Sequence, residues 1–374
     1  MAGIYVHIPF CKKACHYCNF HFSTSRQGKP EMISAIGKEA ILRSDYLAQK
    51  IETLYFGGGT PSLLSKEELQ SIIETIRKYY AVAPDAEITL ETNPDDITTE
   101  NLSVWKASGI NRLSIGIQSF FEEDLQWMNR AHNAAQAKQS IEWAQQAGFS
   151  NITIDLIYGS PGLTDEKWLH NIETALALQI THLSCYALTV EPKTALAKKI
   201  ETRQLEDVDP TIQARQFSLL TARLNDAGFE QYEISNFAVP GHRSRHNSSY
   251  WQGKPYLGLG PSAHSFNGKS RQWNIANNTL YVSSIERGII PFEEEILTSA
   301  QQLNEYIMTA LRTIEGISLA VVTERWGAEK AELLKQSAVK YLLSGKLAIE
   351  NGILGLTVDG KFFADGIAAD LFQL

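Results

Sequence analysis

The sequence predicts an α/β protein built on a parallel sheet, followed by a smaller α+β unit. Strand-like and helix-like segments alternate six times over the first half of the chain, which is the pattern of parallel strands joined by right-handed crossovers. The length of 374 residues exceeds what one compact core usually holds. The last quarter of the chain has a different pattern, helices followed by a hairpin. We therefore expect two units, the larger one first.

The elements of the first unit are short apolar runs, each followed by a segment with apolar residues at helical spacing. Strands are expected over residues 4–8, 51–56, 87–91, 112–117, 152–157 and 182–188. Helices are expected over residues 31–46, 66–79, 100–107, 134–146, 166–178 and 207–228, and an edge strand over 232–238. Six parallel strands are too few to close an eight-stranded barrel.

The second unit reads as three helices and a hairpin, a winged-helix-like order. The helices are expected over residues 299–311, 318–326 and 329–343, and the hairpin over 347–356 around Asn351-Gly352, since Asn-Gly is the strongest short turn signal. The third helix mixes glutamates with lysines and so lacks a basic face for DNA. The expected domains are residues 1–230, a connecting segment 231–277, and residues 278–374.

The composition is that of an ordinary globular protein, with 44% hydrophobic and 20% charged residues. A formal net charge of −8 argues against nucleic-acid binding, which depends on clustered Lys and Arg. We see no basic leader and no apolar run long enough to span a bilayer. Three of the four cysteines fall in one motif, which favours a reducing compartment. We expect a cytoplasmic protein, with Cys185 as a buried strand residue.

The cysteine motif is Cys11, Cys15 and Cys18, with three and then two residues between them. Thiolates at such spacing can converge on one metal centre. Three are one short of a tetrahedral zinc site or a four-thiolate iron–sulfur cluster. A [4Fe–4S] cluster held by three thiolates leaves one iron open to a small molecule. A zinc site would need His16 or His21 as fourth ligand, and a chance cluster of cysteines is the third alternative.

With Tyr17 before the last cysteine, this run resembles the hallmark of the radical S-adenosylmethionine (SAM) superfamily. The resemblance implies a [4Fe–4S] cluster on Cys11, Cys15 and Cys18, SAM chelated at its open iron, and an open (β/α)6 partial barrel of the TIM type. An electron from the cluster can then cleave SAM, and the protein positions the two cofactors.

A glycine-rich turn, Gly57-Gly58-Gly59-Thr60-Pro61, follows the second strand. Such a turn lets the backbone approach a ligand, although a simple flexible turn is the alternative. The sequence resembles the segment of the oxygen-independent coproporphyrinogen III oxidase-like branch. Polar residues also follow the later strands. Taken one at a time, each of them is as well explained by a structural role as by a role in ligand binding. By resemblance to the branch, the SAM site comprises Tyr5, Tyr17, Gly58, Gly59, Thr60, Glu91, Gln118, Arg130 and Asp155, with Thr189 as a looser match.

Residues 246–251 form a second motif, His-Asn-Ser-Ser-Tyr-Trp. A neutral histidine can bind a metal, and the two aromatic rings suit stacking on a macrocycle; packing at a domain seam is the alternative. The pattern resembles the HNxxYW signature of the HemW haem chaperones within this branch. It implies haem binding by His246, Asn247, Tyr250 and Trp251, with His246 on the haem iron. His264, in the glycine-rich stretch 258–266, is a second candidate for haem or SAM contact.

The resemblance places the chain in porphyrin metabolism, with two possible functions. A haem chaperone binds haem and passes it to apo-haemoproteins such as respiratory cytochromes. The dehydrogenase of the branch instead decarboxylates two propionates of coproporphyrinogen III to form protoporphyrinogen IX. That enzyme usually carries a fourth cysteine where this chain has Phe20, and a longer segment before the cluster. We therefore expect the haem chaperone, and leave open whether the chain is also an enzyme.

Several partners follow from this expectation. They are haem, recipient apo-haemoproteins, an electron donor if SAM is cleaved, and at most a transient membrane contact, with a dimer as a possible assembly. Nucleic acid is not expected. A DNA-binding regulator that uses the cluster as a redox sensor is the most distant alternative.

Overall fold

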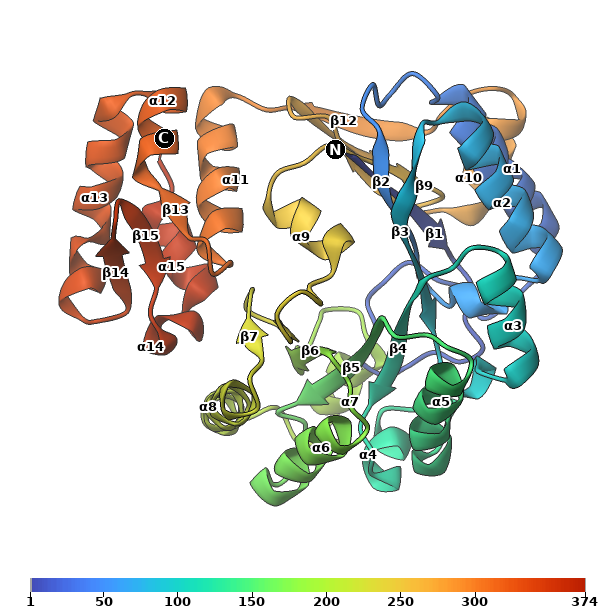
Figure 1. Ribbon diagram of the computed structural model, residues 1–374, viewed down its shortest axis with the longest axis horizontal. Coiled ribbons are helices and arrows are strands. Elements are labelled where there is room, and N and C mark those ends of the chain that lie inside the picture. Colours follow the sequence, from blue (N-terminus) through green and yellow to red (C-terminus); the bar gives the residue numbers. More distant parts are fainter. Residues whose placement is uncertain (1, 374) are drawn as a thin grey trace.

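The computed structural model describes residues 2–373 and confirms an α/β core with a separate C-terminal unit (Figure 1). Six parallel strands form the centre of one sheet, each paired with the next along the chain. These strands are β1 (Ala2–Ile8), β2 (Ile51–Gly58), β3 (Val82–Thr92), β4 (Arg112–Gln118), β5 (Ile152–Tyr158) and β6 (His182–Ala187).

Helices cover the outer face of these strands (Figure 1). They are α1 (Lys29–Leu42), α2 (Lys66–Tyr79), α3 (Thr99–Ala107), α4 (Glu122–Trp127), α5 (Ala134–Gln146), α6 (Asp165–Ala177) and α8 (Pro210–Asp226). Helix α7 (Ala195–Glu201) instead follows the carboxyl end of β6 and packs against the cysteine loop, where Leu196 N–H donates to His16 O at 2.7 Å. Local sequence fixes several starts. At α2, Ser65 and Glu68 form a capping box, which satisfies backbone N–H groups that a helix start leaves unpaired. The short helices α4 and α7 were not predicted.

The sheet extends beyond the six parallel strands at both edges. Its full order is β12-β11-β10-β9-β1-β2-β3-β4-β5-β6-β8-β7. Strand β9 (Tyr256–Leu259) pairs parallel to β1, and β10 (His264–Phe266), β11 (Ser270–Asn274) and β12 (Phe292–Ile296) continue antiparallel. At the other edge are β8 (Asn236–Ala238) and β7 (Glu230–Gln231). Three consecutive glutamates in β12 are exposed, a charge pattern that discourages edge-to-edge pairing.

The segment after residue 230 therefore contributes to the large sheet. Helix α9 (Arg245–Trp251) lies inside the curve of the sheet, and α10 (Asn278–Glu286) packs on α1 (Figure 1). Since α10 and β12 belong to this layer by their contacts, we propose that the C-terminal unit begins near Leu297. The expected division at residue 278 would separate α10 and β12 from the layer against which they pack.

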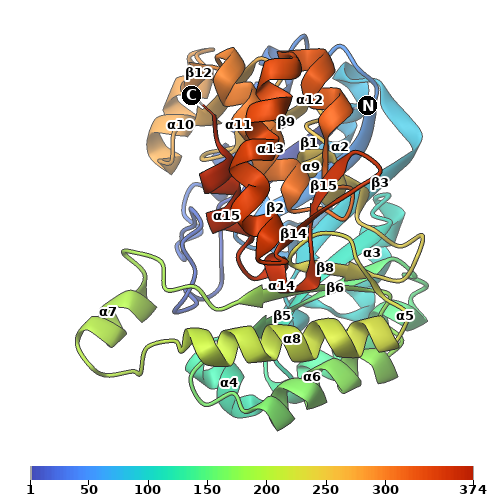
Figure 2. The same cartoon turned by 90° about the vertical axis from the view of Figure 1, so that its left-hand side faces the viewer.

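The C-terminal unit has its own apolar core, built around Leu303, Ile307, Leu334 and Leu354. It contains α11 (Ser299–Leu311), α12 (Leu319–Trp326), α13 (Ala328–Leu343), α14 (Val358–Lys361) and α15 (Ala364–Leu371). Its small antiparallel sheet has the order β13 (Ile317–Ser318), β15 (Ile353–Leu356), β14 (Leu347–Glu350). Figure 2 shows this unit in front of the inner side of the large sheet, away from α3 and α5. No helix within residues 2–373 has both the length and the apolar character needed to cross a membrane.

Candidate functional site

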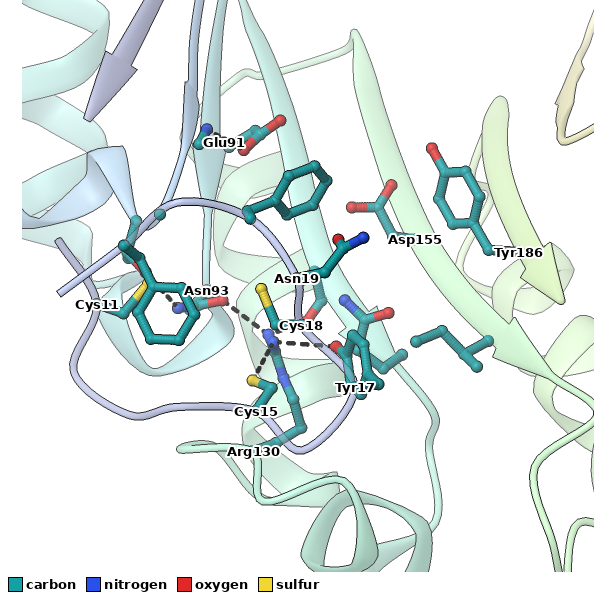
Figure 3. A pocket seen from close by; sticks show the side chains of 18 of the residues that line it. Cys11, Cys15, Tyr17, Cys18, Asn19, Glu91, Asn93, Arg130, Asp155 and Tyr186 are labelled. Atoms are coloured by element: carbon teal, nitrogen blue, oxygen red, sulfur yellow. Dashed lines mark hydrogen bonds between the residues drawn. The ribbon is translucent and has the colours of Figure 1, made fainter. Parts of the chain in front are cut away.

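The three motif cysteines lie on the loop between β1 and α1, at the carboxyl end of β1. Two backbone hydrogen bonds tie the loop back on itself: Cys11 N–H donates to Ser23 O at 3.0 Å, and Ser23 N–H to Pro9 O at 2.9 Å. All three thiols are free and half-buried, and they line one cavity of about 410 Å³ (Figure 3). The loop therefore presents three thiols to one enclosed space.

The same cavity collects the carboxyl ends of five strands, β2 to β6. Every residue predicted for the SAM site lines it except Tyr5, and Thr189 lines it too. Tyr5 lines a second cavity. In parallel α/β folds, ligand sites form at this end of the strands. Successive parallel strands end at this edge of the sheet, and the strand ends and the loops after them supply the polar side chains. Residues far apart in the sequence therefore come together here.

Two carboxyl groups stand in the cavity wall. Glu91 accepts hydrogen bonds from the Tyr55 hydroxyl at 2.8 Å and from Gly58 N–H at 3.2 Å. Burial raises the pKa of Glu91 to about 7, and burial likewise raises the pKa of Asp155 to about 6. Carboxyl groups held this way favour a cationic or hydroxyl-bearing ligand, because such a ligand would offset the cost of their ionisation.

The backbone around the cavity is held in unusual conformations. Gly58 has φ +105°, and a Cβ atom there would lie 2.5 Å from Nδ1 of His7. Gln118 has φ 67° and follows a register shift in β4. Positive φ at a non-glycine residue is strained, and such residues concentrate at functional sites. The close packing of Gly58 on His7 and the strained backbone at Gln118 therefore fix the shape of the strand ends that line the cavity.

Arg130 brings a half-buried positive charge beside the thiols (Figure 3). Its Nη1 lies 3.3 Å from Sγ of Cys15, while Nη2 donates to Asn93 Oδ1 at 2.7 Å and to Gly116 O at 2.8 Å. A guanidinium at this place favours thiolates and any anionic group bound near them. Asn93 was not among the predicted site residues, although it follows Glu91 closely, at the same strand end.

The thiols suit a cluster better than a single metal ion. Burial raises the pKa of Cys11 to about 11, so deprotonation there would accompany metal binding. Among the described residues, no group of three or more His, Cys, Asp or Glu side chains is arranged to hold one ion. In an iron–sulfur cluster each thiolate binds a different iron, so the three sulfurs need not converge on one point.

The two histidines considered as zinc ligands are engaged elsewhere. Nδ1 of His16 bonds to Trp127 O at 2.7 Å and its Nε2 lies 3.0 Å from Lys199 Nζ. Nε2 of His21 bonds to Asn278 Oδ1 at 2.7 Å. The donor set therefore fits a three-thiolate [4Fe–4S] cluster and offers no ready fourth ligand for zinc.

The HNxxYW residues lie on α9 (Arg245–Trp251), and only some of them line a cavity. Tyr250 and Trp251 line a second cavity of about 740 Å³ between the large sheet and the C-terminal unit, whereas Asn247 does not. His246 is 1% exposed. Its Nδ1 bonds to Thr53 Oγ1 at 2.7 Å and its Nε2 to the Tyr250 hydroxyl at 2.8 Å. Both ring nitrogens of His246 are therefore engaged in hydrogen bonds, and binding of iron by either nitrogen would require that its bond be broken.

Comparisons with known proteins agree with the fold and the site in defining a radical SAM protein. Residues 5–175 match the family model of the Radical SAM superfamily, and residues 297–363 match that of the HemN C-terminal domain. The solved structure of coproporphyrinogen III oxidase (HemN) from Escherichia coli superposes with a TM-score of 0.86, covering 100% of this chain and 90% of that one at 23% identity. At this identity the likeness establishes the fold.

Sequence relatives define the family more closely. The haem chaperone HemW of Mycobacterium tuberculosis is 34% identical over 99% of this chain and 94% of that protein. The haem chaperone HemW of Bacillus subtilis is 34% identical over 98% of this chain and 100% of that protein. The chain therefore belongs to the HemW family of haem chaperones within the radical SAM superfamily. Membership of the superfamily implies SAM and a [4Fe–4S] cluster as cofactors.

Proposed function

We propose that this protein binds haem and delivers it to apo-haemoproteins, and that it carries a SAM-binding [4Fe–4S] cluster beside the haem. The observation that carries the proposal is the near full-length identity of 34% to two bacterial haem chaperones. The geometry supports it, because two cavities adjoin and share Asn19 and Phe20 in their walls. One cavity suits the cofactors, and the larger one is within the range of about 300–1,000 Å³ typical of small-molecule sites.

In the smaller cavity, Cys11, Cys15 and Cys18 would hold the cluster. When bound, the cluster and SAM supply one-electron chemistry that no side chain provides. Arg130 would stabilise negative charge near the sulfurs, and Glu91 would accept hydrogen bonds from an ammonium or hydroxyl group. Gly58 lets the turn pack directly on the His7 ring, since a Cβ atom at this position would lie 2.5 Å from Nδ1 of His7.

Loss of one thiol tests the cluster assignment. Cys18→Ser should lose most of its iron and sulfide after anaerobic reconstitution, because two remaining thiolates hold a cluster poorly. Cys185→Ser is the matched control, since that thiol is buried in β6 away from the cavity. Full iron and sulfide content in Cys18→Ser would refute the three-thiolate assignment.

The alternative function is the oxygen-independent coproporphyrinogen III dehydrogenase. The shared fold is compatible with it. Against it, the position of the usual fourth cysteine is occupied by Phe20, whose side chain is 68% exposed and lines both cavities. An exposed aromatic ring here supplies no metal ligand but does offer apolar surface to a flat molecule.

The remaining parts of the proposal concern partners and place. We infer that the recipients are apo-haemoproteins such as respiratory cytochromes, reached through transient contact at a membrane surface from the cytoplasm. An electron donor is required if SAM is cleaved. A dimer is compatible with this function, and nucleic acid has no part in it. Size measurement with and without haem tests the dimer, and pull-down with an apo-cytochrome tests the recipient.

A further inference from the structure

The larger cavity lies where the two units of the chain meet. One wall comes from α9 and from strands β1, β9, β10 and β11 of the large sheet, and the other from α11 and α12 of the C-terminal unit. Its volume is about 740 Å³. The HNxxYW motif accounts for only two of its lining residues, so the character of the site depends on the others.

Aromatic side chains supply much of the wall. Tyr250, Tyr256 and Phe266 form a continuous series, with ring centroids 4.6 Å apart for the first pair and 6.3 Å for the second. Trp251 and Tyr306 also line the cavity. Aromatic faces and edges pack well against a flat conjugated ring. The cavity therefore suits a planar apolar molecule of substantial area.

Three histidines line the cavity, and they differ in the hydrogen bonds they make. His7 bonds through both ring nitrogens, to the Tyr5 hydroxyl at 3.3 Å and to His21 O at 2.8 Å. His21 bonds through Nε2 to Asn278. His264 makes no side-chain hydrogen bond to any residue that the structure describes, and its exposed ring lies 6.2 Å from that of Trp273.

The state of His264 suits metal binding. The imidazole of His264 has no hydrogen-bonding partner among residues 2–373, and a neutral imidazole with a free ring nitrogen is the form that binds metals. From the other unit, Met308 on α11 lines the same cavity with its side chain 36% exposed. Histidine and methionine together are a known axial pair for haem iron.

The two arginines of the cavity also differ. Arg271 forms an ion pair with Glu305. Arg325, on α12, is exposed and stacks on the Trp326 ring at 4.4 Å, and it has no ion pair within residues 2–373. A guanidinium without a carboxylate partner, at the rim of an aromatic cavity, is suited to bind a carboxylate of the ligand.

We propose that haem binds in this interdomain cavity, where an imidazole nitrogen of His264 and the thioether of Met308 would hold the iron and Arg325 would pair with a propionate. The inference rests on the proposed function, that the chain binds haem, and replaces His246 as the iron ligand. His264 lies on β10 of the large sheet and Met308 on α11 of the C-terminal unit, so a haem held by both side chains would link the two units.

The test is a titration of the full-length reconstituted protein with haemin, followed by the Soret band. His264→Ala should bind haemin at least tenfold more weakly and with a shifted band, and added imidazole should restore the wild-type band. His170→Ala is the matched control, an exposed histidine on α6 outside the cavity, and should behave as wild type. Unchanged affinity and spectrum in His264→Ala would overturn the ligand assignment while leaving haem binding intact. Failure of the wild type to bind haemin would instead remove the proposed function.

Two further variants test the cavity and the second ligand. Thr309→Trp places a bulky ring in the cavity and should lower haemin binding, while Ser299→Trp, at the exposed start of the same helix, should not. Circular dichroism checks that both variants fold. Normal binding by Thr309→Trp would contradict the cavity assignment. Met308→Leu conserves volume and should alter the ferrous spectrum; an unchanged spectrum would exclude Met308 as a ligand.

Discussion

Replacement of His246 distinguishes a structural role of this side chain, which would lower stability, from an iron-binding role, which would change the haem spectrum. The imidazole bonds to Thr53 Oγ1 and the Tyr250 hydroxyl at 2.7 and 2.8 Å, and its ring stacks on Tyr55 with centroids 4.8 Å apart. Two buried hydrogen bonds contribute about 1 kcal/mol each, and the ring pair adds about 0.5–1.5 kcal/mol. His246→Ala should therefore lower the free energy of unfolding by about 3 kcal/mol.

The assay is urea unfolding followed by tryptophan fluorescence, with a parallel haemin titration. His246→Gln retains a donor and an acceptor and should recover about 1 kcal/mol of the loss. Under conditions where both variants are folded, the Soret band should stay at the wild-type position if His264 and Met308 hold the iron, as proposed. A shifted band in His246→Ala, with stability unchanged, would refute the structural reading and return His246 to the iron.

Two other predictions concern the cofactor cavity. Gly58→Ala should weaken SAM binding, because the new Cβ atom would lie 2.5 Å from Nδ1 of His7 and the backbone φ is +105°. Calorimetry on the reconstituted protein measures this binding. Gly37→Ala is the control and should bind SAM normally, because its Cβ atom would meet no atom within 4 Å. Glu91 has its pKa raised from 4.5 to about 7 by burial. The folded apoprotein therefore holds this proton more tightly than the unfolded chain, and stability present below pH 4.5 should be lost as the pH rises to about 7. Glu91→Gln should reduce the dependence of the free energy of unfolding on pH between 4.5 and about 7. Urea unfolding at several pH values measures this dependence, and the same dependence in Glu91→Gln as in the wild type would contradict the assignment to Glu91.

Much of the fold could be read from the sequence because its signals are local. Helix α5 is preceded by Asn133, which forms a capping box with Gln136, and the helix has the predicted bounds of residues 134–146. The turn at Asn351-Gly352 does join two paired strands. By contrast, β9 to β12 are short and mixed in polarity, and their pairing depends on partners distant in the chain. Periodicity carries no information about such partners.

The candidate site was predictable to the extent that it follows strand ends. The positions of the cysteines, Glu91 and Asp155 around one cavity follow from the parallel topology. The burial of His246 could not be anticipated, because it depends on Thr53 from β2 and on the extra layer formed by α9. The second cavity depends on how the C-terminal unit docks, which the order of its elements does not specify.

The central claim is that this protein carries haem and does not make its precursor. The most direct measurement is an anaerobic reaction of the reconstituted protein with SAM, a strong reductant and coproporphyrinogen III, run beside transfer from the haem-loaded protein to an apo-haemoprotein. We predict a SAM-dependent change in the cluster's EPR signal, haem transfer and no vinyl product. Repeated turnover to protoporphyrinogen, without transfer, would contradict the account.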